Sequence, residues 1–147
     1  MKRKASAVWQ GDLKTGKGQI STDSGVLSNT QYSFSTRFEN GVGTNPEELI
    51  AAAHAGCFSM AFSAQLGEAG IVPESVKTTA TVTLEKQDGG FAIPEINLDV
   101  VARVPSADEA TVKKAAENAK AGCPVSKLFK ANITMTLKVE TAAKLAI

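Results

Sequence analysis

The sequence predicts an α+β protein in which antiparallel sheets surround one long buried helix. Three observations carry this prediction: alternating strand-like segments in the N-terminal third, an alanine-rich helical segment in the middle, and alternating strands around an amphipathic helix in the C-terminal half. No repeat or low-complexity segment divides the 147 residues, so we expect a single domain over residues 1–147.

The first third of the chain contains the patterns of three short strands. They cover Lys2–Gln10, Lys17–Thr22 and Gln31–Phe38. A turn at Gly11-Asp12 separates the first two, and glycines at 41–43 make a loop after the third. We therefore expect a small antiparallel sheet here.

A strong helix start follows this loop. Asn45 is a good N-cap, Pro46 suits the first helical position, and Glu48 can close a capping box. The helix should run from Pro46 to between residues 67 and 69, where Gly70 stops it.

This central helix is apolar on every side and rich in alanine. Such a helix is buried all round, which is difficult in a chain of 147 residues. We therefore expect a partner subunit to cover part of it.

Two long strands follow, with clean alternation over Val76–Leu84 and over residues 96–104. The turn Asp88–Gly90 joins them as a hairpin, and Pro94 predicts an edge or a bulge at the start of the second strand.

The C-terminal part predicts one helix and one strand. A capping box at Ser106–Glu109 opens the helix, and Gly122 ends it. Ile133–Val139 alternates as a final strand, and Ala142–Ile147 reads as a short tail. The helix should bury Val112, Ala115, Ala116 and Ala119.

Charge and hydropathy narrow the possible partners. The 16 Lys+Arg against 15 Asp+Glu leave a net charge of +1, whereas nucleic-acid binding needs an excess of cations on one face. No run approaches the roughly 18 apolar residues of a membrane span. The basic start of the chain is not followed by a signal-peptide apolar stretch, so we expect a cytoplasmic protein with no nucleic-acid or membrane partner.

The two cysteines, Cys57 and Cys123, are the first candidates for chemistry. Cys57 falls in the middle of the apolar helix, and Cys123 lies between the helix stop Gly122 and Pro124, in extended backbone. If the sulfurs meet, they could form a structural disulfide, part of a zinc site with His54, or a redox pair. A reducing cytosol opposes the first, and the second lacks a fourth ligand. His54 itself fits a packed, hydrogen-bonded histidine.

A reactive thiol must ionise, which requires a nearby cation. The helix dipole fades within the first turn, and burial in the helix raises a thiol pKa. Arg37 is the best candidate because arginine stays charged when buried. Glu47 can orient Arg37, but on a straight helix it lies about 15 Å from Cys57. We therefore expect a site at a subunit interface.

The segment Arg37–Ala61 and the segment Lys120–Ser126 closely resemble the osmotically inducible protein C (OsmC) family, which includes the organic hydroperoxide resistance proteins. The start of the chain, from Trp9 to Leu27, matches as well. The likeness covers nearly the whole chain, and His54 favours the OsmC branch.

This resemblance implies the OsmC fold, an intertwined homodimer with two interfacial active sites. It implies a thiol peroxidase that reduces organic hydroperoxides and, less well, hydrogen peroxide, with an external dithiol as reductant. By motif match, Cys57 is the peroxidatic cysteine, Cys123 the resolving cysteine, Arg37 the activating cation and Glu47 its holder. It implies no cofactor and no metal. A non-catalytic metal- or ligand-binding module and a structural dimer with a stabilising disulfide stay open as alternatives.

Overall fold

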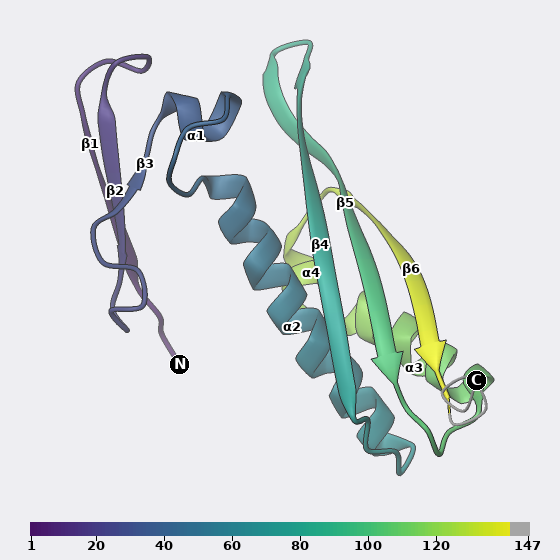
Figure 1. Ribbon diagram of the computed structural model, residues 1–147. Helices are drawn as coiled ribbons and strands as arrows, with labels where there is room; N and C mark the ends of the chain where they lie inside the picture. Colours follow the sequence, from purple (N-terminus) through teal and green to yellow (C-terminus); the bar gives the residue numbers. More distant parts are fainter. Residues whose placement is uncertain (142–147) are drawn as a thin grey trace. The chain divides into compact units, whose positions relative to one another are not determined.

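A computed structural model describes residues 1–141 of the chain. These residues form two compact units, Met1–Leu49 and a second that begins at Ile50 (Figure 1). One helix, α2 (Pro46–Glu68), starts in the first unit and continues in the second. The single domain expected over residues 1–147 stays a prediction.

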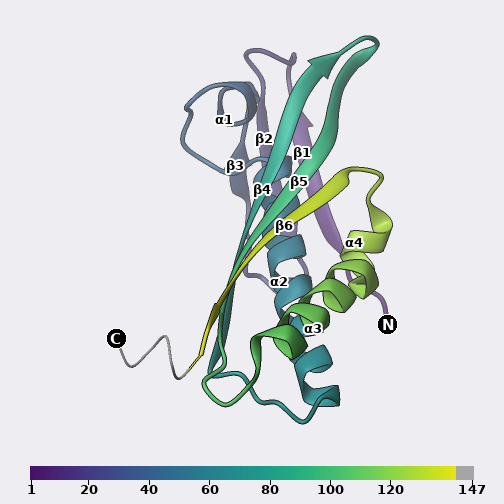
Figure 2. The same ribbon diagram turned by 90° about the vertical axis from the view of Figure 1, so that its right-hand side faces the viewer.

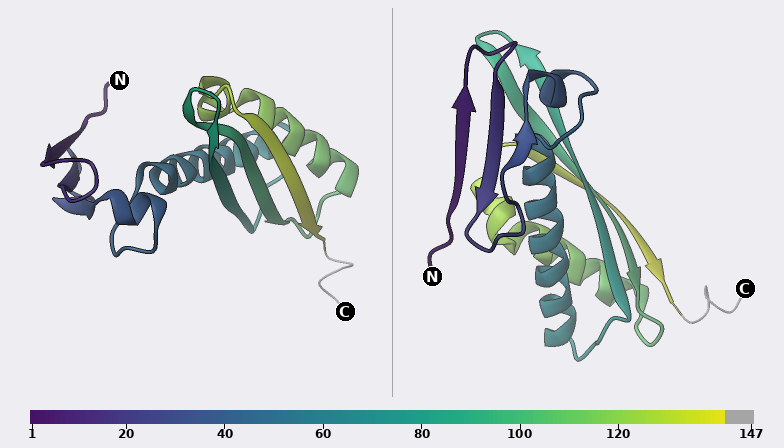
Figure 3. Two further views of the ribbon diagram at one scale, coloured as in Figure 1. Left: turned by 90° about the horizontal axis from the view of Figure 1, so that it is seen from above. Right: turned by 60° about the vertical axis from the view of Figure 1, so that its left-hand side comes forward.

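The first unit contains a small antiparallel sheet in the order β1-β2-β3, which the right-hand view of Figure 3 shows. Its strands are β1 (Ala5–Gln10), β2 (Lys17–Thr22) and β3 (Thr30–Tyr32). Gly18 sits against the Trp9 and Tyr32 rings, where an added Cβ would lie 2.3 Å from the Tyr32 ring. The sheet therefore confirms the first two predicted strands, although β1 starts at Ala5.

The third predicted strand is wrong beyond Tyr32, because a helical turn, α1 (Phe34–Phe38), replaces it. Ser33 begins this turn with a reciprocal capping box. Its hydroxyl accepts from the Thr36 N–H, and the Thr36 hydroxyl accepts from the Ser33 N–H. Local capping thus overrides the strand preference of the aromatic residues in this segment.

The start and the end of α2 follow the prediction. The Asn45 side chain accepts from the Glu48 N–H at 2.8 Å, and Gly70 ends the helix with φ of +75°. The Glu48 carboxylate does not close the expected capping box. It accepts a hydrogen bond from the Thr44 hydroxyl at 2.7 Å instead.

The second unit contains a sheet in the order β4-β5-β6. The strands are β4 (Ser75–Gln87), β5 (Gly90–Arg103) and β6 (Asn132–Glu140). β4 and β5 form the predicted hairpin, and their register shifts next to Pro94, which confirms the predicted bulge. β6 pairs parallel to β5, which corrects the expectation of antiparallel sheets at this position, because the chain crosses over through two helices between them.

Those two helices are α3 (Glu109–Gly122) and the short α4 (Pro124–Leu128), which the sequence did not predict. The N-cap of α3 is Asp108, whose carboxylate accepts from the Thr111 N–H at 2.9 Å, so the capping box at Ser106 is wrong. The buried face of α3 is confirmed in full: Val112, Ala115, Ala116 and Ala119.

The core lies between one face of the β4-β5-β6 sheet and the helices α2 and α3, which cover that face together (Figure 2). α2 contributes Phe58, Phe62 and Leu66, all without solvent exposure. Facing them, β5 buries every second residue: Ile96, Leu98, Val100 and Ala102. The expected tail Ala142–Ile147 lies outside the described residues.

The opposite face of α2 is open in the single chain, so the part of the helix expected to need a partner subunit is this face. Met60 is 78% exposed. Small residues continue this face along the helix: Ala52, Ala53, Gly56, Ser63, Ala64 and Gly67. By length and composition alone α2 could cross a membrane, which corrects the expectation that no segment is long and apolar enough. Within the chain, 22% of the most apolar 18-residue stretch of α2 is buried.

Candidate active site

The two cysteines meet although 66 positions separate them in the chain. Cys57 lies on α2 and Cys123 between α3 and α4, and their Sγ atoms are 2.9 Å apart. Both are free thiols. Cys123 is fully buried, whereas Cys57 is partly exposed. At this distance the two sulfur atoms can share one proton and can join with little movement.

The backbone holds Cys123 in place from both sides. Its N–H donates to the carbonyl of Ala119 at 2.8 Å, which closes α3, and its carbonyl accepts from the Lys127 N–H at 3.1 Å in α4. Pro124 occupies the first position of α4, which keeps Cys123 in non-helical backbone with φ −57° and ψ 124°. Two helix ends thus fix this sulfur opposite Cys57.

The surroundings affect the two thiols in opposite directions. Burial raises the pKa of Cys57, and the neighbouring sulfur of Cys123 raises it further. Burial also opposes ionisation of Cys123, but the neighbouring Cys57 sulfur and the nearby polar groups of Ser126 outweigh it and lower the pKa of Cys123.

His54 lies one helical turn before Cys57 and has no solvent exposure. Its Nε2 lies 2.8 Å from the Ser126 Oγ, and its ring packs edge-on against Phe129. Its Nδ1 has no hydrogen-bond partner. Burial lowers the pKa of His54, which keeps the ring neutral. The expectation of a packed, hydrogen-bonded histidine is confirmed.

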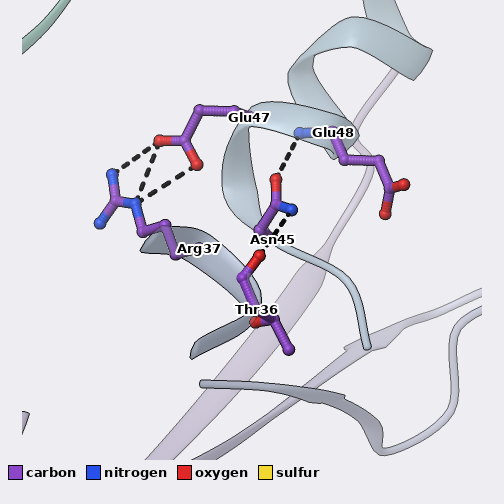
Figure 4. Close-up of polar contacts among 5 residues, drawn as sticks. All are labelled: Thr36, Arg37, Asn45, Glu47 and Glu48. Atoms are coloured by element: carbon purple, nitrogen blue, oxygen red, sulfur yellow. Dashed lines mark hydrogen bonds and ion pairs between the residues drawn. The ribbon is translucent and has the colours of Figure 1, made fainter. Parts of the chain in front are cut away.

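Arg37 and Glu47 form an ion pair within the first unit (Figure 4). The Glu47 Oε1 accepts from Arg37 Nη2 at 2.8 Å and from Nε at 3.1 Å. The Asn45 amide donates to the Thr36 carbonyl at 3.0 Å and so ties α1 to the start of α2. Glu47 is nearly buried while the Arg37 side chain is 38% exposed, so the carboxylate anchors a guanidinium that faces outward.

Sequence reasoning missed one polar residue of this region, Ser126. Its only signal was its position three residues after Cys123. Within residues 1–141, no three His, Cys, Asp or Glu side chains are placed to hold one metal ion.

Comparison with known proteins gives a consistent result. Residues 38–138 match the family described as OsmC-like protein. The chain is 54% identical over 139 residues to Peroxiredoxin OsmC of Escherichia coli, with 95% of this chain and 97% of that protein covered. It is 31% identical over 125 residues to organic hydroperoxide resistance protein-like 1 of Staphylococcus epidermidis, covering 84% and 87%.

The fold agrees with solved structures. The crystal structure of the organic hydroperoxide resistance protein OhrB of Bacillus subtilis superposes with a TM-score of 0.66 at 27% identity, covering 93% of this chain and 98% of that one. The α+β architecture expected from the sequence is therefore confirmed.

Proposed function

Since this chain belongs to the OsmC family, we propose that it is a thiol peroxidase that reduces organic hydroperoxides through Cys57 and Cys123. The observation that carries the proposal is the 2.9 Å approach of two free thiols, one partly exposed and one buried. Its relatives, a peroxiredoxin and an organic hydroperoxide resistance protein, support the same chemistry.

In the first step the partly exposed Cys57 attacks as the thiolate. Its sulfur forms a bond to the distal peroxide oxygen, the O–O bond breaks, and the alkoxide leaves. Cys57 becomes a sulfenic acid, and the proton shared with Cys123 goes to the alkoxide to give the alcohol. The hydroperoxide is reduced by two electrons, which the sulfur supplies.

Arg37 is the group proposed to make this step possible. Burial opposes ionisation of Cys57, so a fixed cation must favour its thiolate and the charge on the departing alkoxide. Glu47 accepts hydrogen bonds from the Nε and Nη2 atoms of Arg37, and these bonds set the orientation of the guanidinium. Glu47 is thus a positioning residue.

In the second step Cys123 attacks the sulfenic sulfur of Cys57. A disulfide forms, hydroxide leaves and takes a proton from solvent to become water. An external dithiol then restores both thiols by exchange and is itself oxidised to a disulfide. This requirement for a dithiol supports a reducing compartment such as the cytoplasm.

The working unit is proposed to be a homodimer with its sites at the interface. Among residues 1–49 no apolar side chain is fully buried, so the first unit has no core of its own. The open face of α2, centred on Met60, is a second apolar surface that lacks a partner within the chain. A second copy of the chain would cover both.

An apolar substrate is supported by a small pocket in the second unit, about 180 Å³ in volume. Phe129, whose ring touches His54, forms one of its walls. Isoleucines provide most of the rest: Ile50, Ile93 and Ile96. An alkyl or aryl group suits such walls better than a polar one.

The test is consumption of cumene hydroperoxide by the reduced protein with dithiol present. We expect turnover in the parent protein, none in Cys57→Ser, and slower turnover in Cys123→Ser, where the dithiol has to reduce the Cys57 sulfenic acid directly. Full turnover in Cys57→Ser would refute the assignment. A dimer that merely carries a structural disulfide would become less stable on reduction without consuming peroxide.

A further inference from the structure

Two contacts between side chains lie next to each other where α2 meets the segment that carries Cys123. One is the approach of Cys57 Sγ to Cys123 Sγ at 2.9 Å. The other is the hydrogen bond between His54 Nε2 and Ser126 Oγ, 2.8 Å long. On α2, His54 lies three residues before Cys57. On α4, Ser126 lies three residues after the N-cap Cys123. Because residues three apart are neighbours on a helix surface, the hydrogen bond lies one helical turn from the sulfur contact.

The hydrogen bond between His54 and Ser126 is shielded from water. His54 has no solvent exposure, and Ser126 is 7% exposed. Within residues 1–141, the Nδ1 atom of His54 has no hydrogen-bond partner. A buried N–H without an acceptor costs free energy, so the ring hydrogen belongs on Nε2, which donates to the Ser126 hydroxyl oxygen. The peroxidase steps described above make no use of either residue.

Loss of this hydrogen bond would leave both ring nitrogens of His54 without a partner in a site that solvent does not reach. Water could replace the missing hydroxyl only if α2 and α4 moved apart to admit it. Cys123 is attached to α4, since its carbonyl accepts from the Lys127 N–H at 3.1 Å. A shift of α4 would therefore move the Cys123 sulfur away from Cys57.

We propose that His54 and Ser126 are positioning residues that set the distance between the two sulfurs. They hold α4 against α2, so that Cys123 stands within bonding reach when the Cys57 sulfenic acid forms. The role requires no proton transfer from either residue. This inference rests on the proposed peroxidase function and names the contact that controls its second step.

The distance between the sulfurs decides the fate of the sulfenic acid. In the productive step the Cys123 thiolate forms the S–S bond, the S–O bond of Cys57 breaks, and hydroxide leaves. In the competing step a second hydroperoxide transfers its distal oxygen to Cys57, which becomes a sulfinic acid while the hydroperoxide becomes an alcohol. The competing step does not involve Cys123, so a wider gap favours it. A displacement of about 1 Å can slow an enclosed reaction by about a hundredfold.

The experiment measures how the Cys57 sulfenic acid partitions, which does not depend on how fast it forms. Fully reduced, full-length protein receives cumene hydroperoxide together with a fixed excess of dimedone. Mass spectrometry then gives the ratio of Cys57–Cys123 disulfide to dimedone adduct on Cys57. Ser126→Ala should lower this ratio by about tenfold or more, and excess hydroperoxide without dimedone should convert more of its Cys57 to sulfinic acid than in the parent. His54→Phe should lower the ratio in the same direction.

Conservative variants at the two positions test the hydrogen bond itself. Ser126→Thr keeps the hydroxyl, and His54→Gln keeps a donor about as far from the backbone as Nε2. Both should hold the ratio nearer to that of the parent than Ser126→Ala does. The amide of His54→Asn reaches only as far as Nδ1, so this variant should behave like His54→Phe. Equal ratios in His54→Gln and His54→Asn would overturn the role of Nε2.

A matched control is Ser59→Ala, which removes a hydroxyl from a hydrogen bond of the same length. The Ser59 hydroxyl donates to Thr78 Oγ1 at 2.8 Å, and this bond ties α2 to β4 instead of α4. Ser59→Ala should leave the ratio unchanged. An unchanged ratio in Ser126→Ala, or an equal fall in Ser59→Ala, would overturn the proposal.

A second readout requires no hydroperoxide. Each protein is equilibrated with reduced and oxidised dithiothreitol, and the fraction of Cys57–Cys123 disulfide gives the reduction potential of the pair. Ser126→Ala should make this potential more positive by about 30 mV, the equivalent of a tenfold weaker tendency of the two thiols to join. Ser59→Ala should leave it unchanged. A potential of Ser126→Ala equal to that of the parent would refute the inference, whereas hydroperoxide left intact by the parent would refute the proposed function alone.

Discussion

Oxidation of the cysteine pair should stabilise the protein strongly against unfolding. The perturbation is one equivalent of hydroperoxide, which converts the two thiols into a Cys57–Cys123 disulfide. The crosslink joins residues 66 positions apart, and it removes chain entropy from the unfolded state without requiring a large native rearrangement, since the sulfurs already lie 2.9 Å apart. For a loop of this length the chain-entropy relation gives about 4 kcal/mol at 25 °C.

The assay is urea unfolding of the oxidised and the reduced protein, monitored by circular dichroism at one protein concentration. With a slope of about 2 kcal/mol per molar urea, a gain of about 4 kcal/mol moves the midpoint up by about 2 M. Cys57→Ser and Cys123→Ser proteins serve as controls, because neither can form the crosslink, so hydroperoxide should not raise the urea midpoint of either. An oxidised parent that unfolds at the same or lower urea would refute the reasoning.

Three further results are expected. Glu47→Gln should slow hydroperoxide reduction by about tenfold while leaving the circular dichroism spectrum unchanged, because Arg37 loses its anchoring charge; an unchanged rate would contradict the role of the ion pair. Met60→Arg should shift the protein towards the monomer in sedimentation experiments, because a charge on the open face of α2 opposes pairing of two copies. Lys114→Glu, at an exposed position of α3, should leave the sedimentation unchanged. The free energy of unfolding should fall as pH drops below about 6.5, because the unfolded chain gains a proton on His54 that burial denies the folded one. His54→Phe should reduce that slope between about pH 7 and 5, and an equal slope in both proteins would show that His54 is not its source.

Helices and strands with a regular spacing of apolar residues were predictable from the sequence, whereas their exact ends were not. The buried face of α3 and the length of α2 follow from side-chain spacing. The error at Ser33 has a local cause, since a reciprocal capping box forms a helical turn where aromatic residues suggest a strand. The predicted N-cap of α3 was Ser106 and the observed N-cap is Asp108. Both residue types can cap a helix, and the sequence alone does not determine which of the two does so.

The candidate site depends on contacts that no local pattern contains. The sequence indicates Cys57 and Cys123 as two separate candidates for chemistry. Only the family resemblance, and not their spacing, predicts that the two sulfurs meet. The contact between His54 and Ser126 joins residues 72 positions apart, and a single serine in a short helix carries no signal of its own. The sequence predicts that α2 needs a partner but not which of its faces stays open, because an apolar helix has the same sequence whether its own chain or a partner covers it.

The most direct measurement of the central claim is a count of thiols against hydroperoxide in a single turnover. Fully reduced protein receives less than one equivalent of tert-butyl hydroperoxide, and alcohol, remaining thiols and disulfide-linked peptides are quantified together. The account predicts that each hydroperoxide consumed yields one alcohol, removes two thiols and creates one Cys57–Cys123 link. Hydroperoxide left intact beside two free thiols, or equal consumption by Cys57→Ser protein, would contradict it.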